Sequence, residues 1–336
     1  MLSLAASPQF ILLSLHIAMF LCPASCHKLT RFYSKAKIAE NIIIKFKNMH
    51  YLQSTLLLIM ILLLSSCSYP KEGKKGESVF IAPVGVQAYS FRNYFPKDIP
   101  GTLDRIQSMG ITEIEGSSGR IPAEEYKKLC DARGISIPST GAGFEQLEKD
   151  PMAIAENAKK LGSKFVMCAW IPHKRGNFTL EDAKKAVAVF NSAGKVLKEN
   201  GLTFCYHAHG FEFQPFENGT LLDYMMEETN PEYVSFEMDV FWIQFGGGDP
   251  VGLLKKYANR WKLLHLKDMK KGTKKDLTGG TDVENNVPLG TGEIDIAGVL
   301  KEARKIGIAH YFIEDESSKV VDQVPKSIAY LRSLRY

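Results

Sequence analysis

From residue 79 onward, the sequence alternates eight times between a short apolar segment and a segment whose apolar residues lie three and four positions apart. The first pattern is typical of buried β-strands and the second of amphipathic helices. Strict β-then-α order predicts a parallel sheet, because each parallel strand needs a crossover connection. Eight such units over residues 79–336 predict an α/β protein with one (β/α)8 TIM barrel. The predicted strands are 84–90, 111–116, 135–141, 164–170, 202–209, 233–240, 261–268 and 309–315.

Helix ends are marked by residues that favour caps. Asp249 followed by Pro250 predicts a helix that starts with an aspartate N-cap and a proline in its first turn. A doubly wound open sheet is the alternative architecture, but no Gly-x-Gly-x-x-Gly motif follows the first strand to favour it. Glycines that precede a predicted strand are expected helix C-caps: Gly110, Gly134, Gly162, Gly201 and Gly307.

The charge distribution and the cysteines restrict the classes of protein to consider. The net charge of +5 is spread along the chain without a basic stripe, so we expect no nucleic-acid partner. Cys130, Cys168 and Cys205 lie in apolar surroundings and are expected to be inert core thiols. The sequence is compatible with a monomer and with a homo-oligomer.

The N-terminal region differs from the rest of the chain. Apolar segments at 10–22 and 56–67 resemble signal-peptide cores. The second ends in Leu-Ser-Ser-Cys, which resembles a bacterial lipobox, so we expect lipidation of Cys67. On this interpretation residues 1–67 are a leader, with 1–48 an extension of the gene model upstream of Met49, and 68–78 form a flexible linker. A simple membrane anchor is the alternative. Both interpretations predict tethering outside the cytoplasm, at the periplasm or outer membrane.

Polar residues occupy one face of the later strands. Side chains alternate along a strand, so residues of one parity face the barrel axis. On that face Asp239, His265 and Glu314 end three consecutive predicted strands, and the strand before them carries His207, with His209 next in line. TIM-barrel active sites lie at this end. Carboxylates with an imidazole predict one divalent cation, with Mn²⁺, Mg²⁺ or Co²⁺ favoured and Zn²⁺ as the alternative.

These residues resemble those of a known family. Over residues 79–336 the chain is similar to the sugar phosphate isomerase/epimerase proteins of the xylose-isomerase-like TIM-barrel superfamily. The resemblance rests on five segments in order: CYHAHGFEF (205–213), EMDVFWIQFGGGDP (237–250), LLHLKDM (263–269), VPLGTGEIDI (287–296) and YFIEDE (311–316).

The resemblance implies a metal held by four side chains at the ends of strands five to eight. Asp239, His265 and Glu314 match three of them. Many members have a glutamate where this chain has His207, so we assign Glu212 as the first ligand; His207 and His209 remain alternatives.

The resemblance does not specify one reaction. Members isomerise or epimerise ketosugars, dehydrate inososes or dehydroshikimate, eliminate an aglycone from 3-keto-glycosides, or cleave DNA at abasic sites. An extracytoplasmic location disfavours DNA repair and phosphorylated sugars. We therefore expect a metal-dependent isomerase or epimerase that removes a proton α to the carbonyl of a non-phosphorylated keto-sugar or glycoside. A 3-keto-glycoside lyase and a tethered, non-catalytic sugar-binding protein are the alternatives.

The remaining site residues follow from strand position. His207 or His209 is expected to transfer the proton, and Lys267 to contact a substrate oxygen. Asp268 faces outward and is interpreted as structural. The Gly-rich segment 269–292 is expected to be an active-site lid. Residues expected to contact the sugar are Gln87, Glu115, Trp170 and Trp242.

Overall fold

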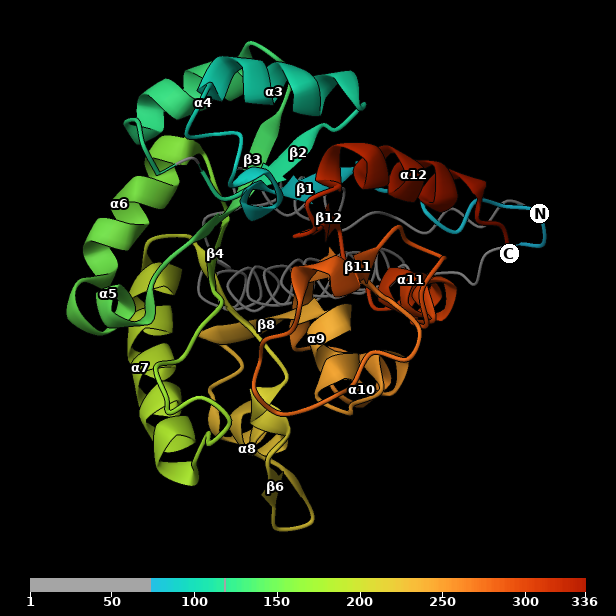
Figure 1. Ribbon diagram of the computed structural model, residues 1–336. Helices are drawn as coiled ribbons and strands as arrows, with labels where there is room; N and C mark the ends of the chain where they lie inside the picture. Colours follow the sequence, from blue (N-terminus) through green and yellow to red (C-terminus); the bar gives the residue numbers. More distant parts are fainter. Residues whose placement is uncertain (1–73, 118) are drawn as a thin grey trace, which may run out of the picture. The chain divides into compact units, whose positions relative to one another are not determined.

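The barrel closes through a complete ring of parallel strands. In the computed structural model, which describes residues 74–117 and 119–336, β1 (Gly85–Gln87) pairs with β12 (His310–Ile313) and joins the two ends of the sheet. Helices surround the strands (Figure 1), so the predicted TIM barrel is confirmed. The other barrel strands are β2 (Glu113–Glu115), β3 (Ser136–Gly141), β4 (Phe165–Cys168), β5 (Thr203–His207), β8 (Val234–Asp239) and β9 (Trp261–Leu266).

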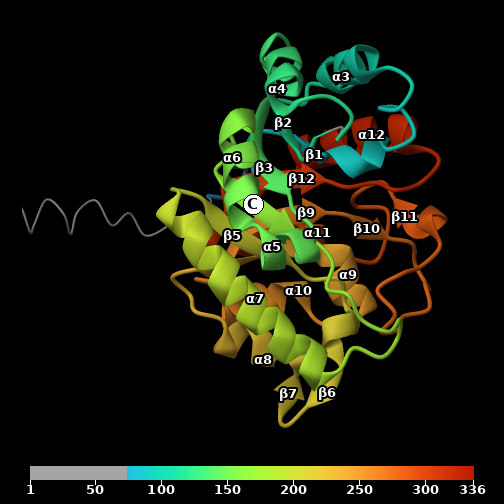
Figure 2. The ribbon, with the colours of Figure 1, turned by 90° about the vertical axis from the view of Figure 1, so that its left-hand side faces the viewer.

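Two antiparallel hairpins lie outside the barrel ring. One pairs β6 (Pro215–Phe216) with β7 (Gly219–Thr220), and it projects beyond α8 (Leu221–Glu228) in both ribbon views (Figures 1 and 2). The other pairs β10 (Asp268–Met269) with β11 (Asn286–Val287) and brings the two ends of the long segment after β9 together.

Several helices begin or end at residues that favour a cap. Thr179 forms a capping box with Asp182 at the start of α7 (Leu180–Glu199), the long helix in the foreground of Figure 2. Asp249 caps α10 (Pro250–Lys256) as predicted, and all five predicted C-cap glycines have positive φ. The remaining helices are η2 (Ala88–Phe91), α3 (Ile99–Ser108), α4 (Ala123–Asp131), α5 (Phe144–Lys149), α6 (Pro151–Leu161), η3 (Phe211–Phe213), α9 (Val240–Phe245), η4 (Val283–Asn285), α11 (Ile296–Lys305) and α12 (Val320–Ser333).

An apolar layer lies below the ionisable mouth of the barrel interior. Cys205, Leu263 and Phe312 are fully buried and form a small apolar cluster of their own. Two residues further along β5 and β9 stand His207 and His265. The larger core lies between the strands and the helices. All three cysteines of the barrel are buried and free, as expected of core thiols.

The N-terminal predictions fall mostly outside the described residues, which include neither the leader nor Cys67. The end of the predicted linker is bound to the barrel: Gly76 N donates to Tyr336 O at 3.1 Å, and Tyr336 N donates to Glu77 O at 3.0 Å. The flexible-linker prediction therefore does not hold for these residues. Within residues 74–117 and 119–336, no helix combines the length and apolarity needed to cross a bilayer.

Candidate metal centre

Four potential metal ligands converge at the carboxyl end of the barrel. His207 ends β5, Asp239 ends β8, His265 stands beside Asp239 in β9, and Glu314 follows β12 directly. The Oδ2 atom of Asp239 lies 3.9 Å from His207 Nε2 and 3.8 Å from His265 Nδ1. His265 Nδ1 lies 3.3 Å from Glu314 Oε2. Atoms bound about 2.1 Å from one ion lie roughly 3.0–3.5 Å apart, so small side-chain shifts would complete such a site.

Two of these ligand atoms are buried without a hydrogen-bond partner. They are His207 Nε2 and Asp239 Oδ2. The other oxygen of Asp239 accepts from Phe241 N and Trp242 N at 2.8 and 3.0 Å, because Asp239 caps α9. Buried polar atoms in folded proteins are nearly always satisfied. Two lone-pair atoms left unpaired beside His265 and Glu314 therefore fit a bound cation.

A second pair of carboxylates orients the two imidazole rings. Glu237 Oε2 lies 3.1 Å from His207 Nδ1, and Glu115 Oε2 lies 2.5 Å from His265 Nε2. Both carboxylates are fully buried. A carboxylate behind a ligating histidine fixes the tautomer that presents the opposite nitrogen to the metal. Glu115, which we expected to contact substrate, thus supports His265, and Glu115 is not among the residues that line the cavity.

The surroundings shift the pKa values of the two histidines in opposite directions. Burial lowers the pKa of His207 well below its usual value, so its ring is neutral. Burial also opposes the charged form of His265, but the Glu237 and Glu115 carboxylates outweigh it and hold the pKa of His265 well above its usual value. Burial raises the pKa of Glu314. The Lys267 ammonium and His265 lower it by more than burial raises it, so the pKa of Glu314 lies well below its ordinary value.

Glu212, the expected first ligand, lies apart from this cluster. Its carboxylate accepts a short hydrogen bond from the Tyr206 hydroxyl and bonds from His209 N at 3.0 and 3.2 Å. Tyr206 alternates with the inward-facing His207 and packs on Phe190 and Phe236 outside the barrel. The structure thus uses Glu212 to hold the turn after β5 and brings His207 into the cluster instead.

Lys267 is buried behind two glutamates rather than exposed to the cavity. Its Nζ lies 3.4 Å from Glu314 Oε2 and makes a shorter contact with Glu316 Oε1. The ammonium also lies 5.0 Å from the centre of the Trp242 ring. Lys267 is not among the residues that line the cavity. It therefore neutralises and positions carboxylates, which differs from the substrate contact expected from sequence.

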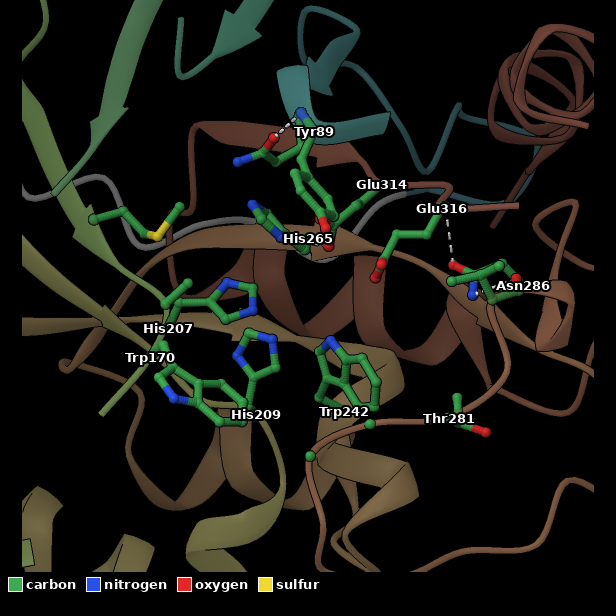
Figure 3. Close-up of a pocket in the computed structure, with 16 residues that line it drawn as sticks. Tyr89, Trp170, His207, His209, Trp242, His265, Thr281, Asn286, Glu314 and Glu316 are labelled. Atoms are coloured by element: carbon green, nitrogen blue, oxygen red, sulfur yellow. Dashed lines mark hydrogen bonds and ion pairs between the residues drawn. The ribbon is translucent and has the colours of Figure 1, made fainter. Parts of the chain in front are cut away.

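The potential ligands open into a cavity of about 380 Å³, here called the metal cavity. Gln87, Trp170 and Trp242, which we expected to contact the sugar, line it. Figure 3 shows His209 between the two tryptophans; its ring stacks on Trp242 with a centroid distance of 5.2 Å. The lining residues that the sequence did not suggest include Tyr89, Met167, Asn286 and Glu316. Glu237 was also missed, although it shares the inward parity of Asp239 and so gave a usable signal.

The segment after β10 forms one wall of the metal cavity. It contributes Gly279, Gly280, Thr281, Val283 and Asn286. Asp268, which we interpreted as structural, anchors the far end of this segment. One of its oxygens accepts from the backbone N–H groups of Gly290 and Gly292, each at 2.9 Å. The other accepts from Met269 N and Ile294 N, so the wall is fixed at its base.

Comparisons with known proteins identify the family of the chain. Residues 103–334 match the family described as Xylose isomerase-like TIM barrel. An inosose dehydratase from Clostridium tetani is 37% identical over 189 residues, 49% of this chain and 62% of that protein's length. An inosose dehydratase from Geobacillus thermodenitrificans is 29% identical over 217 residues, 56% of this chain and 70% of that protein. The structure of a sugar phosphate isomerase/epimerase from Parabacteroides distasonis superimposes with a TM-score of 0.62 at 25% identity, covering 75% of this chain and 96% of that one.

Proposed function

Because the chain belongs to the xylose isomerase-like TIM barrel family, we propose that it is a divalent-metal-dependent enzyme that removes a proton α to the carbonyl of a non-phosphorylated keto-sugar or glycoside. The names of its relatives fit a sugar-modifying enzyme acting on a keto-sugar. The observation that carries the proposal is the pair of unpartnered buried atoms, His207 Nε2 and Asp239 Oδ2, beside His265 and Glu314.

These four side chains are the proposed metal ligands. Two imidazoles with two carboxylates suit Mn²⁺, Co²⁺ or Zn²⁺ better than Mg²⁺, which prefers an all-oxygen shell. Bound there, the cation would supply a Lewis acid for the carbonyl oxygen of the substrate. Glu237 and Glu115 would hold the two rings in the ligating tautomer.

His209 is the proposed proton acceptor. Its Nδ1 is buried without a hydrogen-bond partner, and its ring lines the metal cavity. Burial lowers the pKa of His209 to about 3, so the ring is neutral at physiological pH and has a free lone pair, but it is a weak base in this environment. With His207 assigned to the metal, His209 is the histidine left for acid–base chemistry.

The lining of the metal cavity supports a neutral sugar ring. Tyr89, Trp170 and Trp242 offer flat apolar faces, and Gln87 and Asn286 offer amide groups to hydroxyls. No lysine or arginine is among the described residues that line this cavity, whereas binding a phosphate there would call for positive charge. This supports a substrate that has no phosphate on the reacting ring.

Isomerisation or epimerisation and β-elimination share the proton abstraction and differ in the fate of the resulting anion. Isomerisation and epimerisation return a proton to carbon, whereas β-elimination expels a leaving group from the β-carbon. The inosose dehydratase name shared by the two relatives above favours elimination as the second candidate, because dehydration is an elimination of water.

Incubation in D₂O tests the proposal. The metal-loaded protein is mixed separately with ketosugars, an inosose and a 3-keto-glycoside. Solvent deuterium in an intact, rearranged sugar indicates isomerisation or epimerisation, and loss of water or aglycone indicates elimination. Sugar binding without deuterium exchange or turnover would instead support the non-catalytic binding protein.

Two variants serve as controls. Asp239→Asn and His265→Ala should lose metal and turnover while circular dichroism shows a folded barrel. Full activity in either variant, or in metal-free protein, contradicts the metal assignment.

The proposal includes a lipid tether at Cys67, outside the cytoplasm. It is motivated by the Leu-Ser-Ser-Cys segment after an apolar run. Labelled palmitate should enter the wild-type protein but not Cys67→Ala when both are expressed in a bacterial host. Equal labelling of the two proteins would contradict lipidation at this residue.

A further inference from the structure

We propose that a second cavity beside the metal cavity binds an anionic substituent of the same substrate. This cavity, here called the arginine cavity, has a volume of about 400 Å³ and lies at the carboxyl ends of β1, β2 and β3. The inference rests on the proposed function, because it assumes that a sugar ring occupies the metal cavity. The residues used in the argument are Gln87, Tyr89, Arg92, Arg120, Gly141 and Asn157.

The two cavities are neighbours with a common wall. Gln87 and Tyr89 line both of them. Figure 3 shows the Tyr89 ring extending toward Glu314 and His265 from the β1 side of the metal cavity. Tyr89 is 53% exposed, so a ligand can reach its side chain. A ligand longer than one sugar ring can therefore occupy the metal cavity and continue past Tyr89 into the arginine cavity.

The two cavities differ in the charged residues that line them. Glu314 and Glu316 line the metal cavity, and no lysine or arginine of the described residues lines it. Arg92 and Arg120 line the arginine cavity, and no described residue lining it is acidic. A carboxylate or phosphate on the substrate that reaches the second cavity would be attracted by its two arginines.

Arg92 is held in place without being neutralised. Its guanidinium donates to Glu316 O at 2.7 Å and to Tyr89 O at 3.2 Å, and lies 4.7 Å from the centre of the Tyr89 ring. Both acceptors are backbone carbonyls, and no carboxylate of the described residues forms an ion pair with Arg92. A guanidinium has five N–H donors, so donors remain for an oxyanion. The backbone bonds fix the direction of this cation.

The floor of the arginine cavity leaves room for a ligand. A Cβ built on Gly141, the last residue of β3, would meet no atom within 4 Å. Asn157 on α6 adds an amide group to the lining. Replacing Gly141 by leucine would therefore fill the cavity without removing a charge. Replacing the exposed Arg120 by glutamine would remove a charge without filling the cavity.

Binding of unreactive ligands tests the inference independently of turnover. Phenyl, 4-carboxyphenyl and 4-(phosphonooxy)phenyl β-glucosides carry no keto group, so calorimetry on the full-length, metal-loaded protein measures binding alone. We expect a Kd at least tenfold lower for an anionic ligand than for the phenyl glucoside at low salt, and a smaller ratio at high salt. Comparing the two anionic ligands identifies carboxylate or phosphate as the preferred group.

Variants assign the effect to the arginine cavity. Arg120→Gln and Gly141→Leu should each bring the Kd ratio to within about threefold of one. The matched control Arg133→Gln should leave the ratio unchanged, since Arg133 pairs with Asp104 on the outside of the barrel.

Two outcomes overturn the inference. They are equal Kd values for all three ligands, and an anion preference that survives both Arg120→Gln and Gly141→Leu. Turnover of neutral keto-sugars with equal Kd values would refute the arginine cavity but leave the proposed function intact. An anion preference that depends on Arg120, without turnover of any keto-sugar, would support the arginine cavity but refute the proposed function.

Discussion

The carboxylate of Glu237 lies 3.1 Å from Nδ1 of His207, while Nε2 of the same ring lies 3.9 Å from Asp239. Glu237 and Asp239 are two residues apart on β8, so both face the barrel interior at successive depths. The ring of His207 therefore has one nitrogen bonded to the deeper carboxylate and the other turned to the cluster at the mouth.

This arrangement predicts that Glu237 controls metal affinity without binding the metal. Glu237→Gln should weaken metal binding about 10- to 100-fold, because the amide fixes the tautomer of His207 less well. Metal titration followed by calorimetry measures the change. Glu113→Gln is the matched control, since Glu113 pairs with His310 at the opposite end of the barrel. Equal metal affinity in wild type and Glu237→Gln would contradict the role.

Glu212→Gln should retain its metal but lose stability. The Tyr206 hydroxyl and His209 N donate to this buried carboxylate, and a weakened buried acceptor costs about 1–3 kcal/mol. Urea unfolding gives the free energy of unfolding, and elemental analysis gives the metal content. In contrast, His207→Asn should lose metal. Metal loss in Glu212→Gln would restore Glu212 as a ligand.

Lys267→Met should destabilise the barrel by about 3–5 kcal/mol, because it leaves the buried Glu314 and the partly buried Glu316 without their cation. The measurement is urea unfolding in the presence of chelator. Lys262 is exposed on β9, the strand that precedes Lys267, so Lys262→Met should change the stability little. Adding Glu316→Gln to Lys267→Met should recover part of the loss, and a further loss would refute the charge argument.

Asp268→Asn should loosen the wall of the metal cavity. The new amide group presents N–H donors toward the backbone N–H groups of Gly290 and Gly292, where only an acceptor can bond. We expect hydrogen exchange of residues 290–294 to accelerate at least tenfold, together with a higher KM. Asp276→Asn, in the exposed part of the same segment, is the control. Unchanged exchange in Asp268→Asn would mean that other contacts hold the wall.

The sequence by itself determined the barrel and the face on which chemistry occurs. Strand order follows from the β-then-α alternation, and the inward direction of Asp239, His265 and Gln87 follows from the two-residue period of a strand. Both are local properties of the chain, so a single sequence was sufficient to predict them. The helix caps at Asp249 and Gly162 are equally local and were predicted correctly.

Only the tertiary structure decided which polar side chains meet. Glu212 and His207 are five residues apart, and their roles depend on whether Tyr206 or Asp239 is the nearer partner. Glu115 and Lys267 face inward as expected, yet the register of β2, β9 and β12 gives them His265, Glu314 and Glu316 as partners. Such contacts join strands that are far apart in the chain, and their distances depend on barrel closure, which no local pattern encodes.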